Sequence, residues 1–498
     1  MEEYKRTTCL PNTRLNVKKD IMEWIADGSD DAKKVLWVYG LAGTGKSTLS
    51  TTIAQITREV HRLGAFFFFN RDIPQGNFAT LIRTLAYQLA MFDARFGAAI
   101  SRVAAMNENI AGMPLDFQFS NLLSANALKS VEWSGGTIIL IIDALDESGS
   151  EADRKILMRA LSKGLSDLPS FIRMMVVSRQ EPDIQHALGS HPDVRPYSLD
   201  IESATNKEDV SAFVRHRLDE IRTENEDLHD LWPGQDKIRA LVNNADGLFV
   251  WASTACLYIQ NYDPNQRLNE LITQQPEINE SEPFTNLDKL YNTGLQSAGL
   301  WDNRAFRLDC RNVLGAILCA RTPLSHSMID ILLALPSSRS CLKSISRLGC
   351  VLRIDEKEEI RILHPSFHEY LSERCSGEHW SISLKLHNKE LALCCLKLLD
   401  GELRENICEM TLPHLIQKRT LPEAISYACK FWIEHTCLIS DATDDIIDRI
   451  YDFLVKHLLH WMEALALLKF HDHTIRSIQN LMDWLQVCHP ICMIGPRH

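Results

Sequence analysis

The sequence predicts an α/β fold in which a parallel sheet, covered by helices on both faces, is followed by a long helical region. The first observation is a series of short, continuously apolar segments before about residue 180. The second is that helix-like stretches alternate with these segments, which is typical of parallel strands buried on both faces. The third is that helical spacing of apolar residues prevails beyond about residue 200.

Four buried strands are expected in the first part of the chain. They lie where apolar residues run without interruption, at 35–39, 65–69, 137–142 and 172–177. Helices are expected around and between these strands, and the first of them ends at Gly28, a residue that favours a helix stop. The helices of this part are expected over residues 17–28, 47–61, 81–92 and 151–165.

A hairpin interrupts the helices of the second part. Residues 350–354 and 360–363 are apolar segments on either side of a polar turn, and they follow a stretch of expected helices at 309–347. A hairpin after helices is the plan of a winged helix, so we expect that element here. The other helices of this part are expected over residues 203–221, over 236–260 with an interruption at Asp246 and Gly247, and across 380–487.

Composition and charge exclude several classes of protein. The 498 residues, 45% of them hydrophobic and 24% charged, suffice for about three ordinary globular domains. The 65 acidic residues outnumber the 53 basic ones, which argues against a nucleic-acid partner. The longest apolar runs are far shorter than the ~20 residues of a membrane helix, and the N-terminus has no apolar signal segment. We therefore expect a cytoplasmic protein without a membrane span.

Residues 40–47 form a motif that is typical of phosphate-binding loops. Their sequence, GLAGTGKS, fits the pattern G-x-x-x-x-G-K-[ST] and lies between an expected strand and an expected helix. Glycines let backbone N–H groups approach a phosphate, and a helix N-terminus adds partial positive charge. We predict that Lys46 binds the β- and γ-phosphates and that the Ser47 hydroxyl ligates Mg²⁺. The loop residues expected to contact the nucleotide are Gly40, Gly43, Thr44 and Gly45.

Polar residues follow two of the expected strands. Asp143 ends the strand 137–142, and ligands of parallel sheets bind at this edge, so we expect Asp143 to hold Mg²⁺, through a water. The alternative for Asp143 is a helix N-cap. Asp146 and Glu147 follow within one turn, and either could deprotonate the attacking water, with Glu147 favoured. Arg179, at the end of the next strand, is expected beside the γ-phosphate; its alternative is a surface arginine.

These motifs together resemble the NACHT domain of STAND-class signalling NTPases, in particular that of fungal NOD-like receptors of the nephrocystin-like type. The phrases GLAGTGKSTL, DALDE and VVSR carry the resemblance, and LGAFFFFNRD, LIRTLAYQLA, ADGLFVWAST and ILHPSFHEYL agree with it, over about residues 9–375. It implies an N-terminal segment with an adenine-side helix (1–34), a P-loop NTPase domain (35–200), a helical domain (201–300), a winged-helix domain (301–375) and a C-terminal all-α region (376–498).

The resemblance also implies roles for individual residues. Thr48 joins Lys46 and Ser47 in the nucleotide and Mg²⁺ contacts. Asp143, Asp146 and Glu147 match the family's acidic strand end, and Arg179 matches its sensor arginine. His364, just after the hairpin, matches a winged-helix histidine that contacts the β-phosphate of ADP and holds a closed form.

Two further phrases match the adenine side of the family's site, each with a departure. Arg14 ends the phrase Asn12-Thr13-Arg14, which resembles a Gly-Thr-Arg near the adenine; Asn12 replaces the glycine. Residues 247–249, Gly-Leu-Phe, lie where relatives often have a Gly-x-Pro that touches the adenine, and the proline is absent here.

The function implied by the resemblance is a nucleotide-dependent switch in fungal innate immunity. ADP would hold the closed form, and ATP exchange would open it for self-association or for binding other signalling proteins, with weak ATPase activity. The alternatives are a nucleotide-binding interaction scaffold without significant hydrolysis, and a kinase or nucleic-acid motor, which the acidic balance and the lack of a recognisable acceptor site disfavour. Such receptors usually carry an N-terminal effector and a C-terminal repeat sensor; neither is expected in this sequence.

Overall fold

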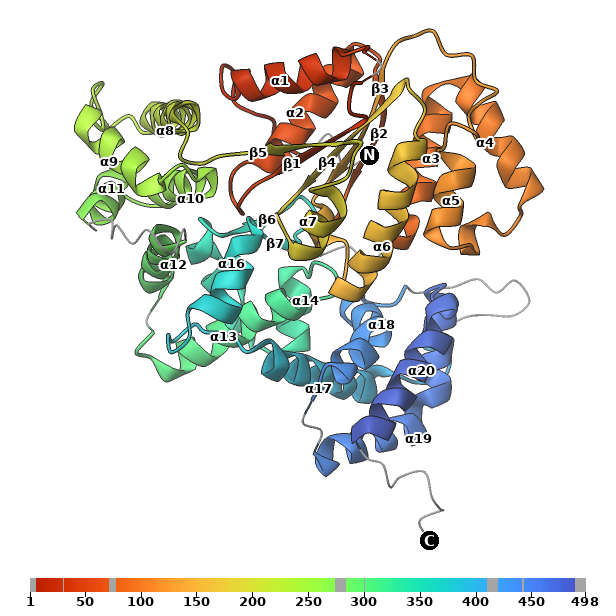
Figure 1. Ribbon diagram of the computed structural model, residues 1–498. Coiled ribbons are helices and arrows are strands. Elements are labelled where there is room, and N and C mark those ends of the chain that lie inside the picture. Colours follow the sequence, from red (N-terminus) through yellow and green to blue (C-terminus); the bar gives the residue numbers. More distant parts are fainter. Residues whose placement is uncertain are drawn as a thin grey trace. The chain divides into compact units, whose positions relative to one another are not determined.

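The computed structural model describes residues 6–29, 31–70, 78–273, 284–299, 301–409, 420–440 and 443–488. The chain divides into two compact units, Met1–Leu290 and Tyr291–His498 (Figure 1). Within the described ranges, no helix is both long enough and apolar enough to cross a lipid bilayer.

A five-stranded parallel sheet is the centre of the first unit. Its strand order is β2-β3-β4-β1-β5, and every neighbouring pair is parallel. The four expected strands are all present, so the predicted α/β fold is confirmed. The strands are β1 (Val35–Tyr39), β2 (Leu63–Phe68), β3 (Ile138–Asp143), β4 (Ile172–Ser178) and the unexpected edge strand β5 (Val194–Ser198).

Helices cover both faces of the sheet because successive strand residues point to opposite sides. Leu36 and Val38 of β1 pack in one apolar layer with α1 and α2, whereas Val35 and Trp37 pack in the other layer with α3 to α6. Figure 1 shows these two groups of helices on either side of the sheet. The helices of this part are α1 (Leu15–Ala26), α2 (Lys46–Glu59), α3 (Leu81–Phe92), α4 (Ala94–Met106), α5 (Leu115–Leu122), α6 (Glu151–Gly164) and α7 (Pro182–Leu188).

A group of helices completes the first unit. The expected break in 236–260 is confirmed, because Asp246 and Gly247 adopt positive φ angles of 46° and 76° between α9 and α10. The Asn206 side chain on α8 donates a hydrogen bond to the Gly247 carbonyl at 2.9 Å and holds this turn. The helices are α8 (Ala204–Glu224), α9 (Gln235–Ala245), α10 (Phe249–Gln260), α11 (Pro264–Thr273) and α12 (Thr285–Ala298), which extends past the division between the units.

In the described residues of the second unit, helices predominate and one β-hairpin is present. The expected hairpin is present as the antiparallel pair β6 (Leu352–Ile354) and β7 (Ile360–Ile362). The C-terminal part is helical where it is described; its residues 410–419, 441–442 and 489–498 lie outside the described ranges. The helices are α13 (Arg304–Cys319), α14 (His326–Leu332), α15 (Leu342–Ile345), α16 (Pro365–Glu369), α17 (Leu384–Glu402), α18 (Glu423–Cys437), α19 (Asp444–Leu467) and α20 (His471–Cys488).

A buried network of polar side chains joins α17 to α18. His435 is fully buried, and its Nδ1 lies 2.8 Å from the amide oxygen of Asn388. Since that oxygen only accepts, Nδ1 carries the proton and Nε2 accepts from the Tyr427 hydroxyl at 2.9 Å. A neutral imidazole therefore satisfies both neighbours, and burial lowers the pKa of His435 to about 3.

We expect the second unit to lose stability as the pH falls. The folded-state pKa of His435 lies below its ordinary value, so below about pH 6.5 the unfolded chain binds the proton more tightly. Between pH 7.5 and pH 5.5 this should remove roughly 1.4 kcal/mol from the free energy of unfolding. Urea denaturation, monitored by hydrogen exchange in α17 and α18, measures this loss. The His435→Gln variant should be less stable than the wild type at pH 7.5, but its free energy of unfolding should fall less between pH 7.5 and pH 5.5. An equal loss in both proteins would contradict this.

Candidate functional site

The loop 40–47 turns the chain from β1 into α2. Gly43 and Gly45 have positive φ angles of 81° and 80°, and Gly45 is the residue that precedes the first turn of α2. Side chains rarely adopt this backbone conformation, which explains the glycines. The turn leaves the first N–H groups of α2 without helical partners at the carboxyl end of β1, where they can bind an anion.

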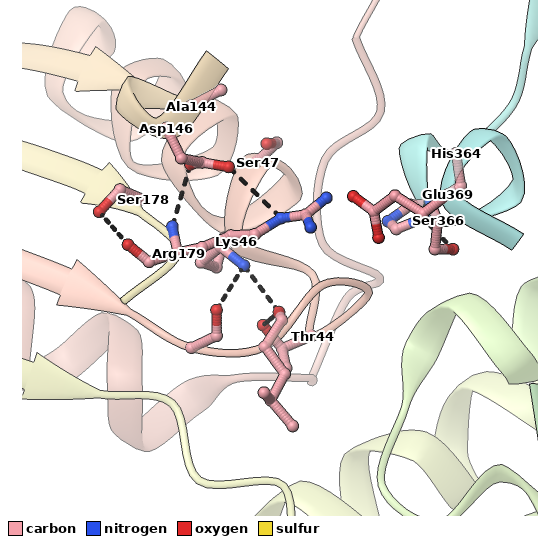
Figure 2. A network of polar contacts seen from close by, with 12 residues as sticks. Thr44, Lys46, Ser47, Ala144, Asp146, Ser178, Arg179, His364, Ser366 and Glu369 are labelled. Atoms are coloured by element: carbon pink, nitrogen blue, oxygen red, sulfur yellow. Dashed lines mark hydrogen bonds and ion pairs between the residues drawn. The ribbon is translucent and has the colours of Figure 1, made fainter. Parts of the chain in front are cut away.

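Lys46 is folded back onto this loop. Its Nζ donates hydrogen bonds to the carbonyls of Gly40, at 2.9 Å, and Leu41, at 2.7 Å (Figure 2). Burial lowers the pKa of Lys46 to about 8, although the nearby Asp146 carboxylate favours the charged form. The ammonium group is therefore held by neutral acceptors, which a phosphate oxygen could replace.

Asp143 faces the same loop from the end of β3. Its side chain is fully buried. Its Oδ1 accepts hydrogen bonds from the Ala144 N–H, at 3.0 Å, and from the Ser47 hydroxyl, at 3.3 Å. Its Oδ2 pairs with the Arg6 guanidinium at 2.9 Å. The structure thus brings together Ser47 and Asp143, the two residues predicted to hold Mg²⁺.

Asp146 and Arg179 form a second pair at this edge. Asp146 is buried, and its Oδ1 accepts from the backbone N–H of Arg179 at 2.9 Å (Figure 2). The Arg179 Nε lies 3.3 Å from Oδ2 of the same carboxylate. Both oxygens of Asp146 therefore hold the segment that follows β4. Glu147 is half-buried in the same short turn, Leu145–Glu147.

Arg14 binds the backbone of the phosphate loop at Thr44. Its guanidinium donates to the Thr44 carbonyl at 2.7 Å and lies over the Phe249 ring, 4.8 Å from its centroid. Its backbone N–H donates to Asp209 of α8 at 3.0 Å. The N–H of Val250 also donates to the Gly43 carbonyl at 3.1 Å. Of the two phrases that the resemblance placed near the adenine, 12–14 thus contacts the phosphate loop through Arg14, and 247–249 is followed directly by Val250, which contacts the same loop.

Thr48 and His364 complete the predicted set. Thr48 is half-buried in the first turn of α2, and its carbonyl accepts from the Thr52 hydroxyl. His364 belongs to the second unit, where it precedes α16 and its Nδ1 accepts from the Ser366 N–H at 3.1 Å. The nucleotide contacts of both residues remain predictions.

Arg6 and Asp209 were not predicted. Each contacts the site through a partner distant in sequence, Arg6 at Asp143 and Asp209 at Arg14. No local motif marks either residue.

A phosphate loop at the end of the first strand, with a buried carboxylate ending another parallel strand, fits the fold of a P-loop NTPase domain. Residues 14–179 match the family model described as "Nephrocystin 3, N-terminal". The curated protein "Vegetative incompatibility protein HET-E-1" of Podospora anserina is 25% identical over 492 residues, which cover 91% of this chain and 35% of the relative. The family model and this relative confirm the predicted resemblance to fungal NACHT proteins of the STAND class.

Two solved structures are more distantly similar. A Signal Transduction ATPase with Numerous Domains protein with a tetratricopeptide repeat sensor from Pyrococcus horikoshii is 13% identical, with a TM-score of 0.41, covering 97% of this chain and 59% of that one. PCH-2 of C. elegans is 12% identical, with a TM-score of 0.30, covering 55% of this chain and 67% of that one. The chain also spans only about a third of the curated relative.

We expect phosphate binding at this loop to weaken above about pH 8. Free Lys46 loses its proton around that pH, whereas a bound phosphate would favour the charged ammonium, so binding at higher pH requires proton uptake. The apparent Kd of ADP should rise by up to about tenfold per pH unit above pH 8. Isothermal titration at pH 7, 8 and 9.5 checks this. Lys46→Arg, which stays charged, should bind with little pH dependence; equal affinity of the wild type at pH 7 and 9.5 would contradict the expectation.

Proposed function

We propose that this protein is an ATP- and ADP-binding NTPase of the NOD-like receptor type that acts as a nucleotide-dependent signalling switch. The observation that carries the proposal is the 3.3 Å contact between the Ser47 hydroxyl and the buried Asp143 carboxylate. It places the phosphate loop and the acidic strand end at one edge of the sheet. A triphosphate on the loop would therefore extend toward the acidic residues.

The donor set fits a nucleotide bound with Mg²⁺. Ser47 and Asp143 offer hydroxyl and carboxylate oxygens, the ligand types that Mg²⁺ prefers, and the ion would neutralise charge between the β- and γ-phosphates. Lys46 would exchange its two carbonyl acceptors for phosphate oxygens, while the N–H groups of 43–48 donate to the same phosphates. Gly40 allows the close turn at the start of the loop.

For hydrolysis we assign different roles to the two acids of the turn Leu145–Glu147. Asp146 uses both carboxylate oxygens to hold Arg179, so it is a positioning residue for that guanidinium. Arg179 would stabilise the charge that develops on the γ-phosphate. We keep Glu147 as the residue expected to deprotonate the attacking water, with Asp146 as the alternative.

The switch itself rests on the resemblance to NACHT proteins. We propose that His364 contacts the β-phosphate of ADP in a closed form, and that ATP favours an open form that self-associates or binds other signalling proteins in the cytoplasm. Suppose that about 99% of the protein is closed with ADP and about 99% is open with ATP. The two nucleotides must then differ about 10⁴-fold, roughly 5.5 kcal/mol, in their preference for the open form over the closed form. The name of the curated relative, a vegetative incompatibility protein, supports a signalling role.

The proposal predicts separate effects of two substitutions on binding and turnover. Lys46→Ala should abolish binding of a fluorescent ATP analogue, because the loop loses its only side-chain cation for the phosphates. Glu147→Gln should bind ATP as the wild type does, but hydrolyse it roughly 10²- to 10⁴-fold more slowly. Fluorescence titration and phosphate release measure the two quantities.

The control is Lys19→Ala, which removes an exposed lysine of α1 that pairs with Glu23. It should change neither binding nor hydrolysis. Unchanged turnover in Glu147→Gln would move the base role to Asp146. Tight binding without any wild-type turnover would favour the interaction scaffold, and full binding by Lys46→Ala would refute the nucleotide site.

A further inference from the structure

A partly buried ion pair lies at the carboxyl ends of β2 and β3. The Arg6 Nη1 lies 2.9 Å from Oδ2 of Asp143, whose side chain is 0% exposed, while that of Arg6 is 26% exposed. The guanidinium also lies over the Phe68 ring, 4.4 Å from its centroid. Phe68 and Asp143 are paired residues of β2 and β3, so Arg6 spans both strand ends.

This pair engages the carboxylate that is proposed to hold Mg²⁺. Oδ1 of Asp143 already accepts from the Ala144 N–H and the Ser47 hydroxyl, and Oδ2 accepts from Arg6. A cation of the chain itself thus compensates the buried charge of Asp143. A divalent ion that approached this carboxylate would have to share Oδ2 with the guanidinium or displace it, because two cations at one oxygen repel each other.

Arg6 belongs to a segment that is fixed at several points. The Cys9 N–H donates to the Thr52 hydroxyl of α2 at 2.8 Å. Arg14 then reaches the Thr44 carbonyl in the phosphate loop at 2.7 Å. The segment therefore runs from the end of β3 past α2 to the loop, along the rim of the proposed site. These contacts anchor the segment at Cys9 and Arg14 without using the Arg6 side chain.

We propose that Arg6 is a built-in cation of the nucleotide site that exchanges with Mg²⁺ at Asp143; this inference rests on the function proposed above. Without Mg²⁺, the guanidinium compensates Asp143 and supplies positive charge beside the phosphates, so nucleotide binding persists. With Mg²⁺, Arg6 would have to share Oδ2 or leave it, and this competition reduces the apparent contribution of the ion to nucleotide affinity. Arg6 thereby sets how strongly nucleotide binding depends on Mg²⁺.

The test compares Mg²⁺ dependence rather than activity. The Kd of a fluorescent ADP analogue is measured in excess Mg²⁺ and in EDTA, and the ratio of the two values is the effect of Mg²⁺. In Arg6→Gln we expect weaker binding in EDTA, unchanged or tighter binding in Mg²⁺, and a ratio about tenfold larger than in the wild type. Arg6→Lys, which keeps the positive charge, should give a ratio close to that of the wild type. Lys19→Gln removes an exposed positive charge of α1 and should leave the ratio unchanged.

Phe68→Leu gives an independent measurement, because it removes the ring beneath the guanidinium and leaves Arg6 and Asp143 in place. It should shift the ratio in the same direction by a smaller factor, and it serves as the test if Arg6→Gln does not fold. Nucleotide binding with the wild-type ratio in the variant tested would overturn the proposal for Arg6 and leave the nucleotide site intact. Absence of wild-type binding in both buffers would instead overturn the proposed function.

Discussion

The common direction of β1, β3 and β4 is the constraint on which the site depends. Tyr39 at the end of β1 is paired with Ser178 at the end of β4, and Ile142 of β3 with Val176 of β4. Because the three strands end at the same edge of the sheet, the residues that follow them lie close together although they are far apart in the sequence. Burial of both faces fixes this register, because a slip by one residue would exchange the two apolar layers.

The polar groups at this edge are balanced by partners within the chain. Lys46 is held by two loop carbonyls, Asp143 by Arg6 and Ser47, and Asp146 by Arg179. Under the proposed function, nucleotide binding at this site would exchange hydrogen-bond partners rather than fill a site with unpaired charges. The surrounding protein limits the cost of that exchange, because Arg14 and Val250 fix the loop from its outer side.

Local patterns in the sequence predict the elements that depend on neighbouring residues alone. Continuous apolar segments located four strands to within about two residues, and the glycine-lysine pattern located the loop between β1 and α2. Strand β5 was missed because its sequence, VRPYS, is not continuously apolar and contains Pro196; pairing with β1 at the sheet edge makes it a strand. The Arg6–Asp143 pair was missed because 137 residues separate its members.

Hydrogen–deuterium exchange with and without ADP and Mg²⁺ tests most directly whether one ligand is held between the phosphate loop and the acidic strand end. Loop N–H groups that donate to phosphate exchange slowly, and a ligand that orders the site also protects the turn after β3. We expect peptides covering 40–48 and 143–148 to gain protection together, at the same nucleotide concentration. Protection of neither peptide at saturating nucleotide, or of 40–48 alone, would contradict this arrangement.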